Sequence, residues 1–220
     1  MADLDAQQLT GLFRLMWLRI DEARHMLGQL DGAIGDADHG NSMADGLAAV
    51  VRALSHASSQ GVGVGDLFPI AAESFLDAVG ATTGPLYASA FLSAGRRYRG
   101  MQTLDVGDIP DLIPAFASGI AARGKATAGD KTMLDVWGPA ARAMANARAS
   151  GKAPLAVLDA ALSAAEEGRE ATRAMIATVG RASRLGQRTL GHVDPGAASA
   201  FIMIAAIRDG LAAHLARGGS

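Results

Sequence analysis

Apolar residues recur at helical spacing in nearly every part of the chain. Near the start, Leu9, Phe13, Met16 and Ile20 fall on one face of a helix with about 3.6 residues per turn, and the pattern continues to about Leu30. Seven later stretches of the same kind predict helices at roughly 42–56, 66–80, 85–99, 108–123, 131–149, 153–179 and 195–217. No convincing alternation of apolar and polar residues interrupts them, so the sequence predicts an all-α protein.

The connections between these helices are short, apart from residues 61–65 and two longer glycine-bearing loops at 31–41 and 180–194. Short links join consecutive helices as antiparallel neighbours, which favours an up-and-down helical bundle. No linker has the length or composition that would divide the chain. We therefore expect one domain that spans residues 1–220.

The composition narrows the classes of protein and partner. Hydrophobic residues make up 50% of the chain and charged residues 19%, which is typical of a packed globular protein. The formal net charge of −2 argues against nucleic acid as a partner. The chain has no cysteine, so a metal ion would need oxygen or histidine ligands.

The sequence predicts neither an export signal nor a membrane span. The acidic start, residues 1–5, lacks the basic and apolar blocks of a signal peptide. The longest uncharged apolar stretch near the C-terminus, residues 197–207, is too short to cross a bilayer. We expect a soluble, cytoplasmic protein.

The first segment that suggests chemistry is the loop after the first helix. Asp31, Asp36 and Asp38 fall within eight residues and are interleaved with glycines. Crowded carboxylates repel one another, and a hard divalent cation such as Mg²⁺ removes that repulsion. The alternative is that Asp36 or Asp38 only caps the helix that begins near Ser42. The spacing lacks the ligand order of an EF-hand, which argues against calcium sensing.

Two further segments suggest anion binding at helix ends. Pro85 suits the first turn of a helix, which places Thr82 and Thr83 at its N-terminus, where hydroxyl and N–H groups bind anions or simply cap the helix. Residues 180–196 combine three arginines with glycines before Asp-Pro-Gly. Arginine suits phosphate recognition through its planar fork, although exposed arginines are also common on protein surfaces.

Residues 123–132 nearly spell a phosphate-binding P-loop. Asp130, however, separates Gly129 from Lys131 and Thr132, and no strand is predicted before the segment. A Walker site is therefore rejected, and a glycine turn that leads into a helix remains. Together, the acidic loop, the hydroxyl-bearing helix start and the arginine-glycine loop predict a magnesium–nucleotide site.

Several strings, spread over about residues 30–200, occur in the order found in a known family. The chain resembles the L subunit of dihydroxyacetone kinase (DhaL) and the matching C-terminal domain of single-chain kinases. The strings that carry the resemblance are Ile34–Gly40, Gly84–Leu86, Arg123–Lys125, Gly129–Met133, Gly180–Ser183, Leu185–Gly186, Gly191–His192 and Asp194–Ala197.

The resemblance implies an eight-helix antiparallel barrel with a nucleotide, ADP or ATP, bound in the loops at one end. Asp31, Asp36 and Asp38 would hold two Mg²⁺ ions that bridge the phosphates. The residues expected on the phosphate side are His39, Gly40, Asn41, Ser42, Thr82 and Thr83. Those expected around the nucleoside are Gly124, Met133, Arg181, Asp194, Pro195 and Gly196.

The resemblance also implies how the work is divided between subunits. A short ketose would be held covalently by a histidine of a separate K subunit, so this chain needs no catalytic base and its own histidines take no such role. The family pattern His-Gly-x-Asn-Met reads His39-Gly40-Asn41-Ser42-Met43 here, which places a hydroxyl where the amide is expected. Thr82-Thr83 likewise stands where a small residue and Ser are common.

The expected function is therefore a ketose kinase subunit, with dihydroxyacetone as the default acceptor. Erythrulose or another small ketose is an alternative, because the acceptor pocket would lie on the partner. The donor is either an exchanging ATP or a phosphotransferase-system phosphoprotein that recharges a retained ADP. A further alternative is a regulatory protein that signals its nucleotide state to a binding partner. A purely structural bundle would bind no Mg–nucleotide. The chain could also form a homodimer.

Overall fold

The computed structural model describes residues 3–80 and 82–218, which are helical almost throughout. Within these residues the only β pairing is an isolated antiparallel bridge between Leu4 and Leu104, so the all-α prediction is confirmed. The α-helices are α1 (Ala6–Glu22), α2 (Arg24–Ile34), α3 (His39–Ser59), α4 (Val64–Ala78), α5 (Thr83–Arg97), α6 (Leu112–Gly124), α7 (Leu134–Ala149), α8 (Pro154–Ala171) and α9 (Pro195–Gly218). Three 3₁₀ helices accompany them: η1 (Val106–Asp111), η2 (Thr172–Ala174) and η3 (Arg181–Thr189).

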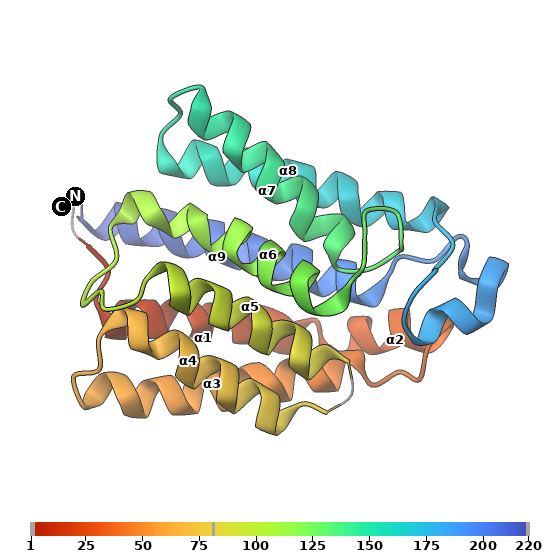
Figure 1. Ribbon diagram of the computed structural model, residues 1–220, viewed down its shortest axis with the longest axis horizontal. Helices are drawn as coiled ribbons and strands as arrows, with labels where there is room; N and C mark the ends of the chain where they lie inside the picture. Colours follow the sequence, from red (N-terminus) through yellow and green to blue (C-terminus); the bar gives the residue numbers. More distant parts are fainter. Residues whose placement is uncertain (1–2, 81, 219–220) are drawn as a thin grey trace.

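The helices pack around a closed circuit. Each of α1, α3, α4, α5, α6, α7, α8 and α9 packs against the next, and α9 returns to α1. Helix α2 lies outside this order and packs on α3 and α9. Figure 1 shows the marked chain ends at one end of the bundle, with α2 and the blue η3 segment at the other.

The first predicted helix is two helices, so the described residues hold nine α-helices where the family resemblance implied eight. An Asp5–Gln8 capping box starts α1, and the chain leaves helical geometry at Ala23. The new direction brings α2 very close to α3: a Cβ added to Gly40 would lie 2.1 Å from the carbonyl oxygen of Arg24. Only a residue without a side chain permits this crossing.

Several predicted boundaries were wrong near the end of the bundle that holds α2. The 31–41 loop is short, because α2 continues to Ile34 and α3 begins at His39. The helix predicted over 153–179 ends at Ala171, where the Thr172 hydroxyl accepts a hydrogen bond from the N–H of Asp194 at 3.0 Å. The 180–194 loop contains η3.

The core explains the apolar character of the last helix. Between Pro195 and Arg217, α9 is long and apolar enough to cross a membrane by length and composition alone. It packs against α1, α7 and α8, and buried side chains from all nine α-helices form one connected hydrophobic cluster. The apolar composition of α9 is therefore accounted for by core packing.

Candidate functional site

Two adjoining cavities open among the loops that join the helices at the α2 end of the bundle. The larger has a volume of about 210 Å³ and the smaller about 140 Å³. The larger lies against α5, α6, η3 and the start of α9, and the smaller against the acidic loop. The residues that line both are Asp31, His39, Thr82, Thr83, Gly180 and Arg181.

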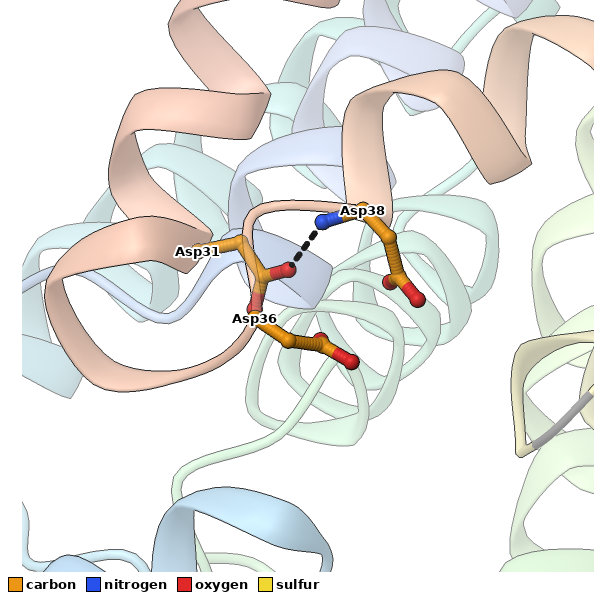
Figure 2. A group of neighbouring side chains, drawn as sticks. All are labelled: Asp31, Asp36 and Asp38. Atoms are coloured by element: carbon orange, nitrogen blue, oxygen red, sulfur yellow. Dashed lines mark hydrogen bonds between the residues drawn. The ribbon is translucent and has the colours of Figure 1, made fainter.

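The three predicted carboxylates meet at the smaller cavity. Oxygen atoms of Asp31, Asp36 and Asp38 all lie within 4.8 Å of one another. Asp31 belongs to the last turn of α2 and is 9% exposed, whereas Asp36 and Asp38 are exposed. Figure 2 shows the Asp31 carboxylate accepting a hydrogen bond from the backbone N–H of Asp38.

Asp31 organises the loop as well as contributing to the cluster. Its Oδ2 accepts from the N–H groups of Asp38 at 2.9 Å and His39 at 3.1 Å, so a side chain on α2 satisfies the first N–H groups of α3. Asp38 stands at the N-cap of α3 without a side-chain capping bond. The plain capping alternative for Asp36 and Asp38 is therefore not what the structure shows.

The backbone between α2 and α3 is tightly constrained. A Cβ added to Gly35 would lie 2.2 Å from Oδ1 of Asp31, so only glycine leaves that carboxylate in place. Ala37 adopts a left-handed conformation with φ of 64°, which is costly for a residue with a side chain. The loop maintains this conformation to bring the three carboxylates together.

Arg181, the first residue of η3, balances part of this negative charge. Its Nη1 forms an ion pair with Asp36 and lies 3.4 Å from Oδ2 of Asp38. Arg181 lines both cavities, as does His39. Arg181 thereby contacts the acidic loop although it lies 143 positions after Asp38 in the sequence.

His39 is buried beneath the cluster. Its Nε2 lies 2.9 Å from Oγ of Ser199 on α9. Burial lowers the pKa of His39 to about 4, although the nearby Asp31 carboxylate opposes the shift. The imidazole is therefore neutral near pH 7, and it links α3 to α9 at the floor of the site.

The threonine segment faces the same space. Thr82 precedes α5 without a side-chain capping bond, and Thr83 begins the helix. Both line the two cavities, and Ser42 of α3 lines the smaller one. Their hydroxyl groups thus lie around the acidic cluster, and their role in binding an anion stays a prediction.

The opposite wall of the larger cavity comes from the start of α9. Asp194 is buried and caps this helix, since its Oδ2 accepts from the N–H of Ala197 at 2.7 Å. Burial raises the pKa of Asp194 to about 7. A Cβ added to Gly196 would lie 3.0 Å from Asp194 Oδ2 and 3.5 Å from Met133, so this wall is closely packed. Gly124 and Pro195 complete it.

Two predicted residues lie away from both cavities. Gly40 forms the close crossing with Arg24 described above. The Oδ1 of Asn41 accepts from Nη1 of Arg24 at 3.2 Å, and Asn41 borders a separate depression beside α2. Successive residues at the start of α3 point in different directions, so the structure turns Asn41 away while keeping His39 and Ser42 at the site.

Known proteins resemble this chain over most of its length. The family described as the DAK2 domain matches residues 33–209. The chain belongs to the DAK2-domain family. The matched residues include Asp36 and Asp38 and the residues between Thr82 and Gly196 that line the larger cavity. Asp31 lies just before the first matched residue.

The relatives of this DAK2 domain include whole subunits and parts of larger enzymes. This chain is 37% identical to the PEP-dependent dihydroxyacetone kinase 1, ADP-binding subunit DhaL of Listeria innocua. The alignment covers 88% of this chain and 93% of that protein. The chain is 36% identical to the corresponding subunit of Escherichia coli, covering 83% and 86% of the two chains. The L-erythrulose 1-kinase of Mycolicibacterium smegmatis is 33% identical over 87% of this chain, which spans 32% of that enzyme.

A solved structure supports the fold of the DAK2 domain. The dihydroxyacetone kinase from C. freundii, in complex with AMP-PNP and Mg²⁺, superposes with a TM-score of 0.66 at 24% identity. The match covers 91% of this chain and 33% of that one. At this identity the similarity concerns the arrangement of the helices.

The DAK2 domain contains cavity residues that sequence reasoning did not predict. Leu86 and Ile120 belong to apolar helical stripes, which read the same whether they face a core or a cavity. The residues missed in the larger cavity are Ile34, Gly35, Leu86, Ile120, Ala126, Lys131, Thr132, Val179, Gly180 and Ala182. Most of them are apolar or small, so a mainly apolar cavity lies beside the carboxylate cluster. This arrangement suits a ligand with an apolar part and an anionic part bound through a cation.

Proposed function

We propose that this chain is the ADP-binding subunit of a dihydroxyacetone kinase. The observation that carries the proposal is a three-carboxylate cluster adjoining an apolar cavity, in a chain that aligns with nearly the full length of proteins named as such subunits. A subunit of this kind presents a phosphoryl group to an acceptor that another chain holds. The reaction class is phosphoryl transfer to an alcohol.

The acidic cluster is proposed to hold two Mg²⁺ ions. All its donors are carboxylate oxygens, the ligands that Mg²⁺ prefers, and Asp36 and Asp38 are open to solvent. When bound, the ions would neutralise the charge of the phosphates. Asp31, Asp36 and Asp38 would hold them, and the bonds from Asp31 to the α3 backbone keep that carboxylate in a fixed orientation.

The two cavities would divide the nucleotide between them. The phosphate side is proposed to include Ser42, Thr82 and Thr83, with the neutral His39 beneath it. The nucleoside would occupy the larger cavity among Gly124, Met133, Arg181, Asp194, Pro195 and Gly196. Gly40 would act through the crossing of α2 over α3, and a nucleotide contact from Asn41 is not supported by its position.

The names of several relatives support a proposal for the phosphoryl donor and the partner subunit. Three of these subunits are named PEP-dependent and one, from Lactococcus lactis, PTS-dependent. We accordingly propose that a phosphotransferase-system phosphoprotein recharges a retained ADP and that a K subunit presents the ketose, in the cytoplasm. Erythrulose is the second candidate acceptor, because three relatives are named erythrulose kinases and this chain spans about a third of each.

The test is to identify the nucleotide that the protein retains. The protein is purified with Mg²⁺, dialysed extensively and denatured, and the released nucleotide is identified by chromatography. Retained ADP supports the proposed phosphoprotein donor, and uptake of ATP by an empty protein would instead indicate an ATP-dependent kinase. Binding of neither nucleotide would contradict the proposal.

Asp36→Asn should abolish ADP retention, because the substitution removes the negative charge proposed to hold Mg²⁺. Helix content and melting temperature should stay nearly unchanged, because Asp36 is exposed. The matched control is Asp66→Asn, an exposed carboxylate in the first turn of α4. Equal ADP retention by Asp36→Asn and the control would show that the cluster does not hold the metal.

A further inference from the structure

The segment that resembles a P-loop holds its lysine in a buried position beside the larger cavity. Lys131 is 2% exposed, although it is charged. Its Nζ donates to the carbonyl oxygens of Thr172 and His192, the latter at 2.6 Å. A buried ammonium needs such partners, because leaving it without hydrogen bonds would be very unfavourable. Lys131 is thus bonded to two backbone groups from outside its own segment.

Those two carbonyl groups flank one excursion of the chain, residues 173–191, which we call the strap. It contains the end of η2, an irregular stretch and η3. The base of the strap is closed by two further bonds: the N–H of Gly191 donates to the Arg173 carbonyl at 2.8 Å, and the N–H of Asp194 donates to the Thr172 hydroxyl at 3.0 Å. Lys131 adds a side chain that holds both ends at once.

Asp130, the residue before Lys131, bonds to the strap at a second point, Thr178. The Thr178 hydroxyl donates to Oδ1 of Asp130, and the N–H of Thr178 donates to the Asp130 carbonyl at 3.3 Å. The other carboxylate oxygen of Asp130 accepts from the N–H of Thr127 at 2.6 Å. Asp130 and Lys131 therefore anchor the base and the first limb of the strap to the same short segment.

That segment is itself fixed in an unusual backbone conformation. Lys131 has a φ of 60° and Gly129 a φ of 96°. Asp135, buried in the first turn of α7, accepts from the N–H of Gly129 at 2.5 Å and from the N–H of Thr132 at 2.8 Å. The turn is thus tied to α7, and it presents Asp130 and Lys131 to the strap from a rigid base.

The contacts of Lys131 and Asp130 matter for function because the strap contains residues that line the site. Val179, Gly180 and Arg181 line the larger cavity, and Arg181 reaches Asp36 and Asp38. We infer that Lys131, assisted by Asp130, is a positioning residue that fixes the strap so that Arg181 stands at the nucleotide and metal site. The inference rests on the proposed nucleotide function, and it assigns Lys131 a role through Arg181 and no direct contact with phosphate.

The central experiment compares Lys131→Met with Lys125→Met. Methionine retains an unbranched stem but removes the ammonium group. Lys125 is a good control because it is an exposed lysine nearby, also with a positive φ, of 54°. Lys131→Met should speed hydrogen exchange of strap amides and release of a fluorescent ADP analogue in Mg²⁺ by about tenfold or more each, since charged hydrogen bonds are lost. Lys125→Met should resemble the unmodified protein in both.

A double-mutant cycle separates positioning from general destabilisation. If Lys131 acts through Arg181, then adding Arg181→Met to Lys131→Met should speed ADP release much less than Arg181→Met does alone. Additive effects would overturn the inference. Faster ADP release with unchanged strap exchange would also overturn it, because Lys131 would then be a direct ligand contact.

If Lys131→Met does not fold, Thr178→Val tests whether the strap is anchored to the segment that contains Asp130 and Lys131. Thr178 is exposed, and its substitution removes only the hydroxyl bond to Asp130. Faster strap exchange together with faster ADP release supports the anchor, and no change in either contradicts it. Should the unmodified protein bind no nucleotide, the proposed function fails, while strap exchange measured without nucleotide still tests the anchor by itself.

Discussion

The two sides of the site are built in opposite ways. The acidic side, residues 31–39, is organised mainly by a local contact, since Asp31 bonds to residues seven and eight positions later. The strap side is held by distant residues, since Lys131 bonds to carbonyl groups 41 and 61 positions away. The acidic side carries concentrated carboxylates, whereas the strap contains four arginines and no acidic residue.

The difference indicates how each side responds to change. A locally held loop depends on a few residues whose geometry is exacting. A strap held from outside depends on the assembly of α7, α8 and α9 around Lys131, so we expect it to open locally more readily than the acidic loop. Three tests address this contrast, beginning with the largest expected effect.

Asp194, at the base of the strap, should make stability depend on pH. Burial raises its pKa from 3.8 to about 7. Between those values the unfolded chain releases the proton and the folded chain retains it, so stability falls as pH rises through this window. The loss should reach about 4 kcal/mol above pH 7.

The measurement is the free energy of urea unfolding, at about pH 4 and pH 8 without Mg²⁺, for the unmodified protein and Asp194→Asn. Asparagine still caps α9 but cannot ionise. The variant should gain stability relative to the unmodified protein only at the higher pH. Parallel pH profiles would mean that Asp194 is not held protonated by burial.

Asp31→Ala should both abolish ADP retention and lower stability by about 3 kcal/mol, because the N–H groups of Asp38 and His39 lose their acceptor. Asp36→Ala should abolish retention with little effect on stability, since Asp36 is exposed. Unfolding by urea and nucleotide release, measured on both variants, separate the two roles. Similar stability losses in both would show that the loop is not organised by Asp31.

Gly35→Ala should have a smaller effect, about 2 kcal/mol, because the new methyl group would displace the Asp31 carboxylate. Gly32→Ala is the control: its Cβ would contact only the side chain of Ala37, at 3.4 Å, and alanine favours the helix. Melting temperature and Mg²⁺-dependent ADP binding should fall for the first variant and hold or rise for the second. A Gly35→Ala protein with unaltered ADP binding would contradict the tight fit.

The acidic side was largely readable from the sequence, because its signal is local. Three carboxylates within eight residues predicted a metal cluster, and the structure brings Asp31, Asp36 and Asp38 together. The prediction that Asp31 lies in a loop was wrong, since helical hydrogen bonding continues through it to Ile34. Asn41 lies away from both cavities because one residue along a helix turns the side chain by about 100°.

The strap side was less readable, because its structure depends on distant partners. The apolar and alanine-rich stretch over 153–179 favours helix, yet the chain leaves helical geometry after residue 174, where Lys131 and Asp194 bond to Thr172. No periodicity reports such tertiary contacts. The cavity lining from Leu86 and Ile120 was hidden for a related reason, since a helix stripe does not indicate whether it faces a side chain or a ligand.

The uneven distribution of charge has a kinetic consequence. The chain has a net charge of −2, but Arg173, Arg181, Arg184 and Arg188 give the strap a charge of +4. An anion that approaches along the strap meets a local charge opposite in sign to the net charge, whereas Asp31, Asp36 and Asp38 at the same end repel it unless a cation neutralises them. The rate at which a nucleotide is captured will therefore follow the strap, and it will decrease as salt shortens the reach of those four charges.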